Sequence, residues 1–231
     1  MKYLVVILLL IPFFTNAATL VDDTFTVGTN TNLQDHTPDT GSGYTYLSGG
    51  TAVIMQSVDS VGKFSSRALY KNDTAIGSAD YDAYITIKHG GSAYVPTMVC
   101  VRINGASNDR YCGGLGDNGG NPASKIIKVV GGTETSLGVA DTFGPAANDI
   151  YRLNVTGDDL TLYRNGVSKV TASDSDVTAT GNAGVDFMAA EAGVDTIDEQ
   201  IDNFQVVGTA AGGGSVIINS ILALVRAFWI F

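Results

Sequence analysis

The chain has 231 residues, 28 of them glycine, and a formal net charge of −10. An acidic surface repels phosphate backbones, so nucleic acid is not an expected partner. The length allows one large β domain or two small ones. Glutamate is scarce and no segment of the domain keeps a helical stripe of apolar residues, which favours an all-β class.

The first seventeen residues have the layout of a secretory signal peptide. Lys2 precedes an apolar run over residues 4–14, and a small residue, Ala17, ends the segment. The alternative is a retained membrane anchor, for which the run is too short to span a bilayer comfortably. We therefore expect residues 1–17 to be removed, residues 19–208 to form one domain, and the protein to be secreted or held at an extracellular surface.

Short apolar segments recur about every ten residues through this domain, as in a β-sandwich. The segments 44–47 and 52–56 are expected to pair around Gly49-Gly50, and 125–130 with 135–139 around Gly131-Gly132. About a dozen strands are expected. Those outside 149–184 lie at residues 24–27, 44–47, 52–56, 67–71, 84–89, 95–104, 110–115, 125–130, 135–139, 185–190 and 201–207.

Residues 149–184 give the clearest local pattern. Tyr151, Leu153 and Val155 alternate with polar residues, which predicts a half-buried strand. Asn165-Gly166 stands between two such runs and is a strong signal for a tight hairpin. The segment therefore predicts consecutive hairpins of a sandwich.

Cys100 and Cys112 are the two cysteines of the chain. They lie on two expected strands, 95–104 and 110–115, and the midpoint between them falls in the loop at residues 105–109. They should therefore lie opposite each other across a hairpin, and an exported chain would join them in a disulfide. The alternative is two buried free thiols.

Four segments together resemble the concanavalin A-like lectin/glucanase superfamily, in particular its laminin-G-like jelly-roll domains. They span most of residues 19–208. They are Asp22-Asp23-Thr24-Phe25 with HTPDTG at 36–41, KVVGGTE at 128–134, YRL at 151–153 with LYRNG at 162–166, and IDNFQV at 201–206. The resemblance implies a two-sheet antiparallel jelly-roll sandwich with a concave face, and often carbohydrate binding with Ca²⁺.

The sequence lacks the acid pattern of glycosidases with this fold. Glycosidases of this superfamily usually carry acids at alternate positions along one strand, so that the carboxylates point into the same cleft. The acids at Asp198, Glu199 and Asp202 do not have that spacing, and Glu134 and Glu191 stand alone. A glycoside-active enzyme is therefore the less favoured alternative.

A Ca²⁺ site is a further expectation. The first and last strands of such sandwiches commonly pair, which would bring Asp22 or Asp23 near Asp202 and Asn203. Carboxylate and amide oxygens are suitable Ca²⁺ ligands. The alternative is that these residues only border strand ends, as single Asp residues in turns often do.

Sugar binding would use aromatic platforms and planar polar groups on one exposed face. Of the available residues, Tyr84, Arg102, Arg110 and Tyr111 are the predicted ligand-binding set. The alternative is that they belong to the core edge or the plain sheet surface. The other aromatic candidates are Tyr81, Tyr94 and Tyr163.

A Gly-rich linker at residues 209–215 leads to an apolar tail, Val216 to Phe231, which Arg226 interrupts. The tail is short for a membrane helix. It would be an interfacial anchor, a removable sorting signal or a segment that docks on a partner. The leading hypothesis for the whole chain is a non-catalytic glycan-binding or adhesion module. The second is a structural coat protein that uses this tail for membrane or self-association.

Overall fold

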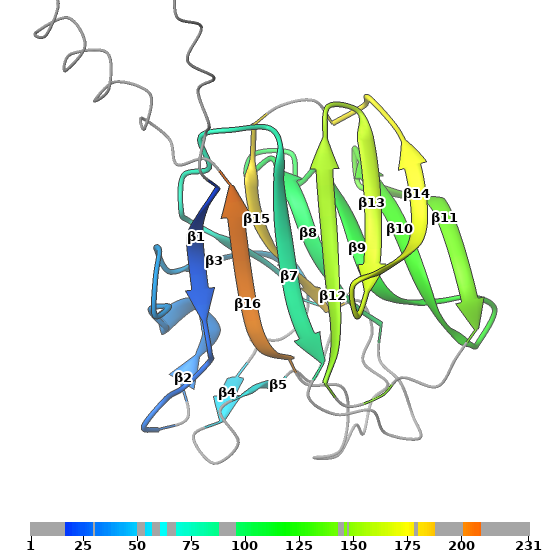
Figure 1. Ribbon diagram of the computed structural model, residues 1–231. Coiled ribbons are helices and arrows are strands. Elements are labelled where there is room, and N and C mark those ends of the chain that lie inside the picture. Colours follow the sequence, from blue (N-terminus) through cyan, green and yellow to red (C-terminus); the bar gives the residue numbers. More distant parts are fainter. Residues whose placement is uncertain are drawn as a thin grey trace, which may run out of the picture.

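A computed structural model describes residues 17–29, 31–49, 54–56, 61–63, 68–87, 96–142, 146, 148–177, 180–187 and 201–208. The first sixteen residues of the expected signal peptide, the linker and the apolar tail lie outside the described residues. The described residues form an antiparallel two-layered sandwich (Figure 1). In this part of the chain no helix is long and apolar enough to cross a membrane.

The first layer, called sheet A, holds both the first and the last described strands. Its strands in spatial order are β14 (Val167–Ser173), β13 (Asp159–Arg164), β12 (Asp149–Thr156), β7 (Tyr81–Ile87), β16 (Ile201–Gly208), β5 (Val61–Lys63), β4 (Ile54–Gln56) and β2 (Thr31–Asn32). In addition, β1 (Ala18–Asp23) pairs with β16. The expected pairing of the first and last strands is therefore confirmed.

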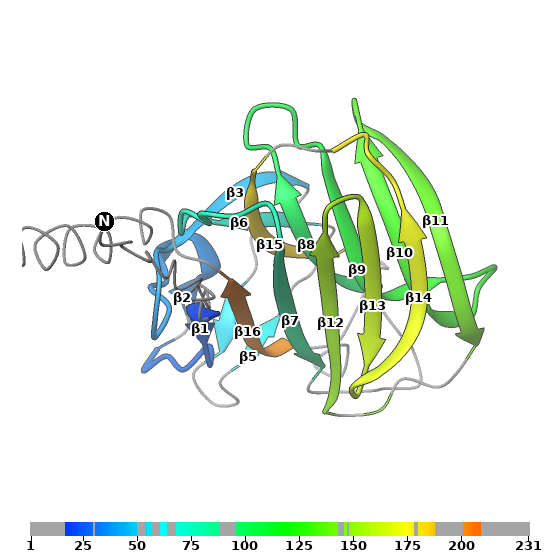
Figure 2. The same cartoon turned by 45° about the horizontal axis from the view of Figure 1, so that its top comes forward.

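The second layer, called sheet B, packs against the inner face of sheet A (Figure 2). Its strands in spatial order are β11 (Thr133–Thr142), β10 (Pro122–Val130), β9 (Arg110–Asp117), β8 (Thr97–Ile103), β15 (Asn182–Phe187), β6 (Ala68–Asn72) and β3 (Tyr44–Gly49). A short 3-10 turn, η1 (Leu33–Asp35), precedes β3. The all-β sandwich predicted from the sequence is confirmed, with more strands than expected because β2 and β5 are too short to show a sequence pattern.

The core lies between the sheets and follows from strand alternation. In β7 the odd-numbered residues are buried and the even-numbered ones are half-buried, so alternate side chains point to the core and to the outside. Tyr70, Tyr151, Phe187 and Phe204 are among the large side chains that fill the core. This burial of aromatic area is a major source of stability for the domain.

The predicted hairpins of residues 149–184 are present. The chain turns between β13 and β14 at Asn165 and Gly166, with φ values of 51° and 78°. Two successive residues in the left-handed region are what a two-residue hairpin turn requires, and Asn-Gly meets that requirement at low steric cost. This turn sets the register of β13 against β14.

Two strand expectations were wrong. The first strand is β1 rather than residues 24–27, because Phe25 adopts a left-handed φ of 51° and its N–H bonds to the Asp23 side chain, which ends the strand. The segment 44–47 does not pair with 52–56 either: β3 pairs with β6 in sheet B, while β4 pairs with β2 and β5 in sheet A. Pairing of segments that are close in the sequence was the wrong prediction here, because the chain crosses from sheet B to sheet A after β3.

Candidate functional site

The outer face of sheet A carries a row of two tyrosines and one arginine. In register, Arg152 on β12 lies opposite Tyr84 on β7 and Tyr163 on β13. The three strands lie side by side in the front layer of Figure 1. Because neighbours in register share a face, these side chains form a continuous surface, which we call the tyrosine–arginine row.

The guanidinium of Arg152 is stacked on one of the rings. Its Cζ lies 3.7 Å from the ring centre of Tyr163 and 6.0 Å from that of Tyr84. A planar guanidinium is attracted to the electron-rich face of an aromatic ring, and the contact restricts its rotamers. Arg152 is therefore held in place while its side chain stays 30% exposed.

Asp82 and Asn154 border the row on the same face. Asn154 Nδ2 donates a hydrogen bond of 2.9 Å to Asp82 Oδ1, and Asp82 Oδ2 lies 3.9 Å from Arg152 Nη1. That ion pair is longer than a hydrogen bond. Among the described residues the guanidinium of Arg152 makes no hydrogen bond, so its N–H donors are available to a ligand.

Three of the four predicted ligand-binding residues are buried. Arg102 donates hydrogen bonds to the carbonyl oxygens of Ala79, Val177 and Gly157, at 3.1, 3.2 and 2.6 Å. Its side chain is only 3% exposed. It therefore ties three loops together at one end of the sandwich, and we assign it a structural role.

Arg110 and Tyr111 also have internal partners. Arg110 Nη2 lies 2.6 Å from Asp186 Oδ2 in a buried ion pair. The Tyr111 hydroxyl donates to Asp174 Oδ1 at 2.7 Å and accepts from the Val177 N–H at 2.9 Å. Burial and the hydrogen bond to Asp174 raise the pKa of Tyr111 to about 12. Of the predicted set, Tyr84 alone lies on the outer face of sheet A.

The disulfide expected from the sequence is present. Cys100 on β8 lies directly opposite Cys112 on β9, and the two are bonded. Their side chains belong to a second apolar cluster, on the side of sheet B that faces away from the core, together with Met98 and Ile127. The bond therefore links β8 and β9 covalently at buried positions.

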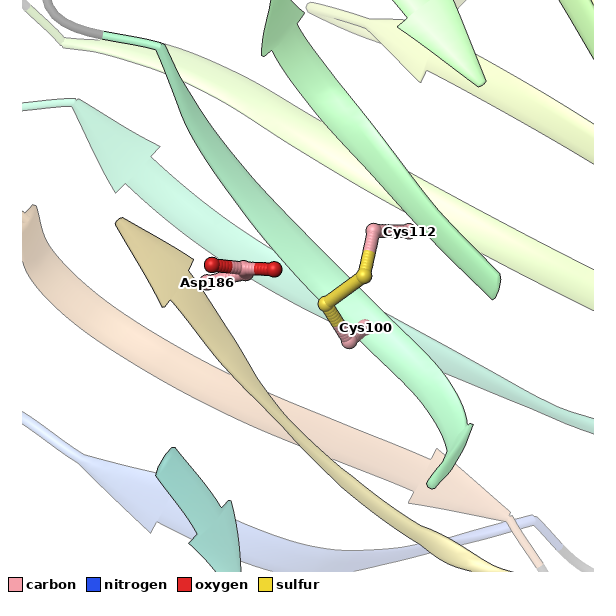
Figure 3. Close-up of side chains that lie close together, drawn as sticks. All are labelled: Cys100, Cys112 and Asp186. Carbon is pink, nitrogen blue, oxygen red and sulfur yellow. A yellow bond between two sulfur atoms is a disulfide. The ribbon is translucent and has the colours of Figure 1, made fainter. Parts of the chain in front are cut away.

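The two sulfurs lie close to a carboxylate on the next strand. Figure 3 shows Asp186 beside the Cys100–Cys112 bond, and the three ligand atoms lie within 4.8 Å of one another. Sulfurs joined in a disulfide offer no thiolate to a metal, and Asp186 is bound by Arg110. With the disulfide formed, we assign the cluster of Cys100, Cys112 and Asp186 a structural role.

The comparisons with known proteins concern the fold. No protein-family model and no curated protein sequence matches the chain. The fold is similar to the carbohydrate-binding module CBM66 from Bacillus subtilis, with a TM-score of 0.52, 14% identity, and coverage of 73% of this chain and 93% of that one. It is also similar to the metal-free exoplasmic/lumenal domain of VIP36, with a TM-score of 0.53, 10% identity, and coverage of 84% and 93%.

The chain has the concanavalin A-like fold. At sequence identities this low, the similarity shows the architecture only. Any site must therefore be argued from this chain's own residues. The laminin-G-like subtype stays a prediction.

Two of the predicted Ca²⁺ ligands, Asp22 and Asp23, face opposite sides of sheet A in this concanavalin A-like sandwich. Asp23 points into the core, where its carboxylate accepts hydrogen bonds from Phe25 N–H at 2.8 Å and Tyr44 hydroxyl at 2.7 Å, and contacts His36 Nε2 at 2.8 Å. Asp22 points outward and pairs with Gln205. Adjacent strand residues face opposite sides, so the two carboxylates are separated by the sheet.

The other two predicted ligands lie further along β16. Asp202 is three residues from Gln205, which is about 10 Å along a strand, and Asn203 lies opposite Thr86 on the outer face. A calcium ion held by Asp22 or Asp23 together with Asp202 and Asn203 stays a prediction.

A glycosidase needs two carboxyl groups on one face, about 5–10 Å apart. The described strands of sheet B carry four acids: Asp117 on β9, Glu134 and Asp141 on β11, and Asp186 on β15. Two of the four have a cationic partner, since Arg110 binds Asp186 and Lys125 Nζ lies 3.8 Å from Glu134 Oε1.

Sequence reasoning missed Arg152. Its position between Tyr151 and Leu153 in an alternating strand already indicated an outward side chain. Its neighbours across the sheet could not be read locally, since the pairing of β7 with β12 joins residues far apart in the sequence. That register places Arg152 between Tyr84 and Tyr163 and makes the row a candidate site.

Proposed function

We propose that this chain is an exported, non-catalytic carbohydrate-binding module that takes its glycan on the tyrosine–arginine row of sheet A. The guanidinium of Arg152 carries the proposal. It is stacked on Tyr163, partly exposed, and makes no hydrogen bond within the described part of the chain. A planar donor that is already ordered loses little entropy when it binds hydroxyl oxygens.

The surrounding residues suit the two surfaces of a sugar ring. A pyranose or furanose has a face of C–H groups and an edge of hydroxyls. The rings of Tyr84 and Tyr163 have negative faces, which attract partly positive C–H groups. Asp82 and Asn154 add a carboxylate and an amide at the border of the row. A few well-placed polar groups beside aromatic surface are typical of small-ligand sites.

The comparison of folds supports this assignment. One similar structure is described as a carbohydrate-binding module, and the same architecture hosts unrelated functions. The sequence lacks the acids at alternate positions of one strand that glycosidases with this fold carry, which favours binding over hydrolysis. Export remains part of the proposal, and the disulfide between Cys100 and Cys112 agrees with an oxidising compartment.

The test is a binding measurement on immobilised polysaccharides with two charge-matched variants. Arg152→Met removes the stacked guanidinium and keeps the length of the stem, whereas Lys125→Met removes one positive charge from sheet B. We expect Arg152→Met to bind at least about tenfold more weakly, since two hydrogen bonds are lost, and Lys125→Met to bind like the parent. Equal binding by all three proteins, or binding by none, would contradict the proposal.

A further inference from the structure

We infer that the ligand is a neutral glycan chain that lies across the strands of sheet A, at right angles to them. This inference rests on the proposed function and specifies its substrate class and orientation. It follows from the way the outward side chains of six strands align in register, and from the charges beside them.

The tyrosine–arginine row is the middle of a longer row. Tyr84 lies opposite Gln205 on β16, Gln205 opposite Asp22 on β1, and Tyr163 opposite Ser168 on β14. Neighbouring strands are about 4.8 Å apart, so the six positions span about 24 Å. That length accommodates several sugar units in a line. The row in spatial order is Asp22, Gln205, Tyr84, Arg152, Tyr163 and Ser168.

The surface along the strands is different. On one side of the row, Thr86 lies opposite Ile150, and on the other side Asp82 lies opposite Asn154. Neither neighbouring pair contains a ring, so a ligand directed along β7 or β12 would leave the aromatic surface after one sugar. The continuous aromatic and planar surface runs across the strands, and this sets the direction of the chain.

The charges on the face favour a neutral ligand. The positive charge of Arg152 is offset by the carboxylate of Asp82, 3.9 Å away. Asp22 adds a further carboxylate at one end of the row and accepts a hydrogen bond of 3.4 Å from Gln205. The whole chain carries a formal net charge of −10. A polyuronate or sialylated glycan would therefore be repelled both locally and at long range.

The experiment is isothermal titration of the full chain with oligosaccharides of two to six units from laminarin, arabinan, levan and mannan, and from polygalacturonate as the acidic probe. We expect affinity for one neutral series to rise with chain length and to change little between 50 and 300 mM salt. Gln205→Ala should weaken the hexamer about threefold to tenfold, the loss of one hydrogen bond, and leave the dimer unchanged. Thr86→Ala is the matched control beside the row.

The outcomes distinguish a failure of the inference from a failure of the function on which it rests. Binding of polygalacturonate alone would overturn the neutral class and leave glycan binding intact. Weakening by Thr86→Ala with no effect of Gln205→Ala would overturn the direction of the chain. If no glycan of the panel binds, both the inference and the proposed function fail for these glycans. Far-UV circular dichroism of each variant verifies that the sheets are folded.

Discussion

The outer faces of the two sheets use the same pair of residue types in opposite ways. On sheet A, Arg152 and Asp82 lie at a half-exposed surface, 3.9 Å apart. On sheet B, Arg110 and Asp186 are buried and 2.6 Å apart. The strands explain the difference, because β7 alternates buried and half-buried residues, whereas every residue of β8 is buried. An arginine at an outward position can therefore either bind a ligand or stabilise the fold, and the burial of its side chain decides between these two roles.

The largest expected effect is the loss of the buried pair. Arg110→Met should lower the free energy of unfolding by about 3–5 kcal/mol, because the Asp186 carboxylate stays buried after losing its guanidinium. Urea denaturation at pH 7 measures it. On sheet A, Arg152→Met should change the same quantity by less than about 1 kcal/mol. Similar losses in the two variants would remove the distinction between the faces.

The disulfide of sheet B should come next. Replacing Cys100 and Cys112 together by serine removes a cross-link that closes a loop with a sequence separation of 12. The expected loss is about 3 kcal/mol in the chain-entropy description. Thermal unfolding with and without reductant measures the same change in the parent protein. A melting temperature that reductant leaves unaltered, with the thiols shown to be free, would contradict this account of the buried cluster.

A smaller, pH-dependent effect is expected at the β12–β13 end of sheet A. Although burial opposes it, hydrogen bonds from Arg164, Asn165 and the Ala146 N–H hold the pKa of Asp149 below its ordinary value. A carboxyl with a lowered folded pKa stabilises the protein above its unfolded pKa, and this contribution is lost as the pH falls below about 4.

Asp149→Asn should therefore lower the free energy of unfolding at pH 7 by about 1.5–3 kcal/mol, the range for hydrogen bonds to charged groups. It should also make the loss of stability between pH 6 and pH 3 shallower than in the parent. Urea midpoints at the two pH values measure both changes. A variant that keeps the slope of the parent would show that other carboxylates dominate acid unfolding.

The sequence predicted the features that depend on local pattern. Asn165-Gly166 located a hairpin, Gly131-Gly132 located the β10–β11 turn, and the spacing of Cys100 and Cys112 placed them opposite each other. All of these involve strands that are neighbours in both sequence and space. Their registers are set by the turns themselves.

The site was only partly predictable, because it depends on pairings between distant segments. Tyr84 and Tyr163 were candidates, but Arg152 gained its role only through the pairing of β7 with β12. Arg110 and Tyr111 were expected at a surface. Every residue from Arg110 to Gly116 in β9 is buried, so this strand is covered on both faces. A run of apolar residues and glycines without alternation could have indicated that burial.

The central claim is that the outer face of sheet A holds the glycan. The most direct measurement is an NMR titration of the isotope-labelled protein with the neutral oligosaccharide that binds best. The account predicts that the perturbed amides gather around Tyr84, Arg152 and Tyr163 and extend toward Gln205. Perturbations that gather instead on β8, β9 and β15 of sheet B would contradict it.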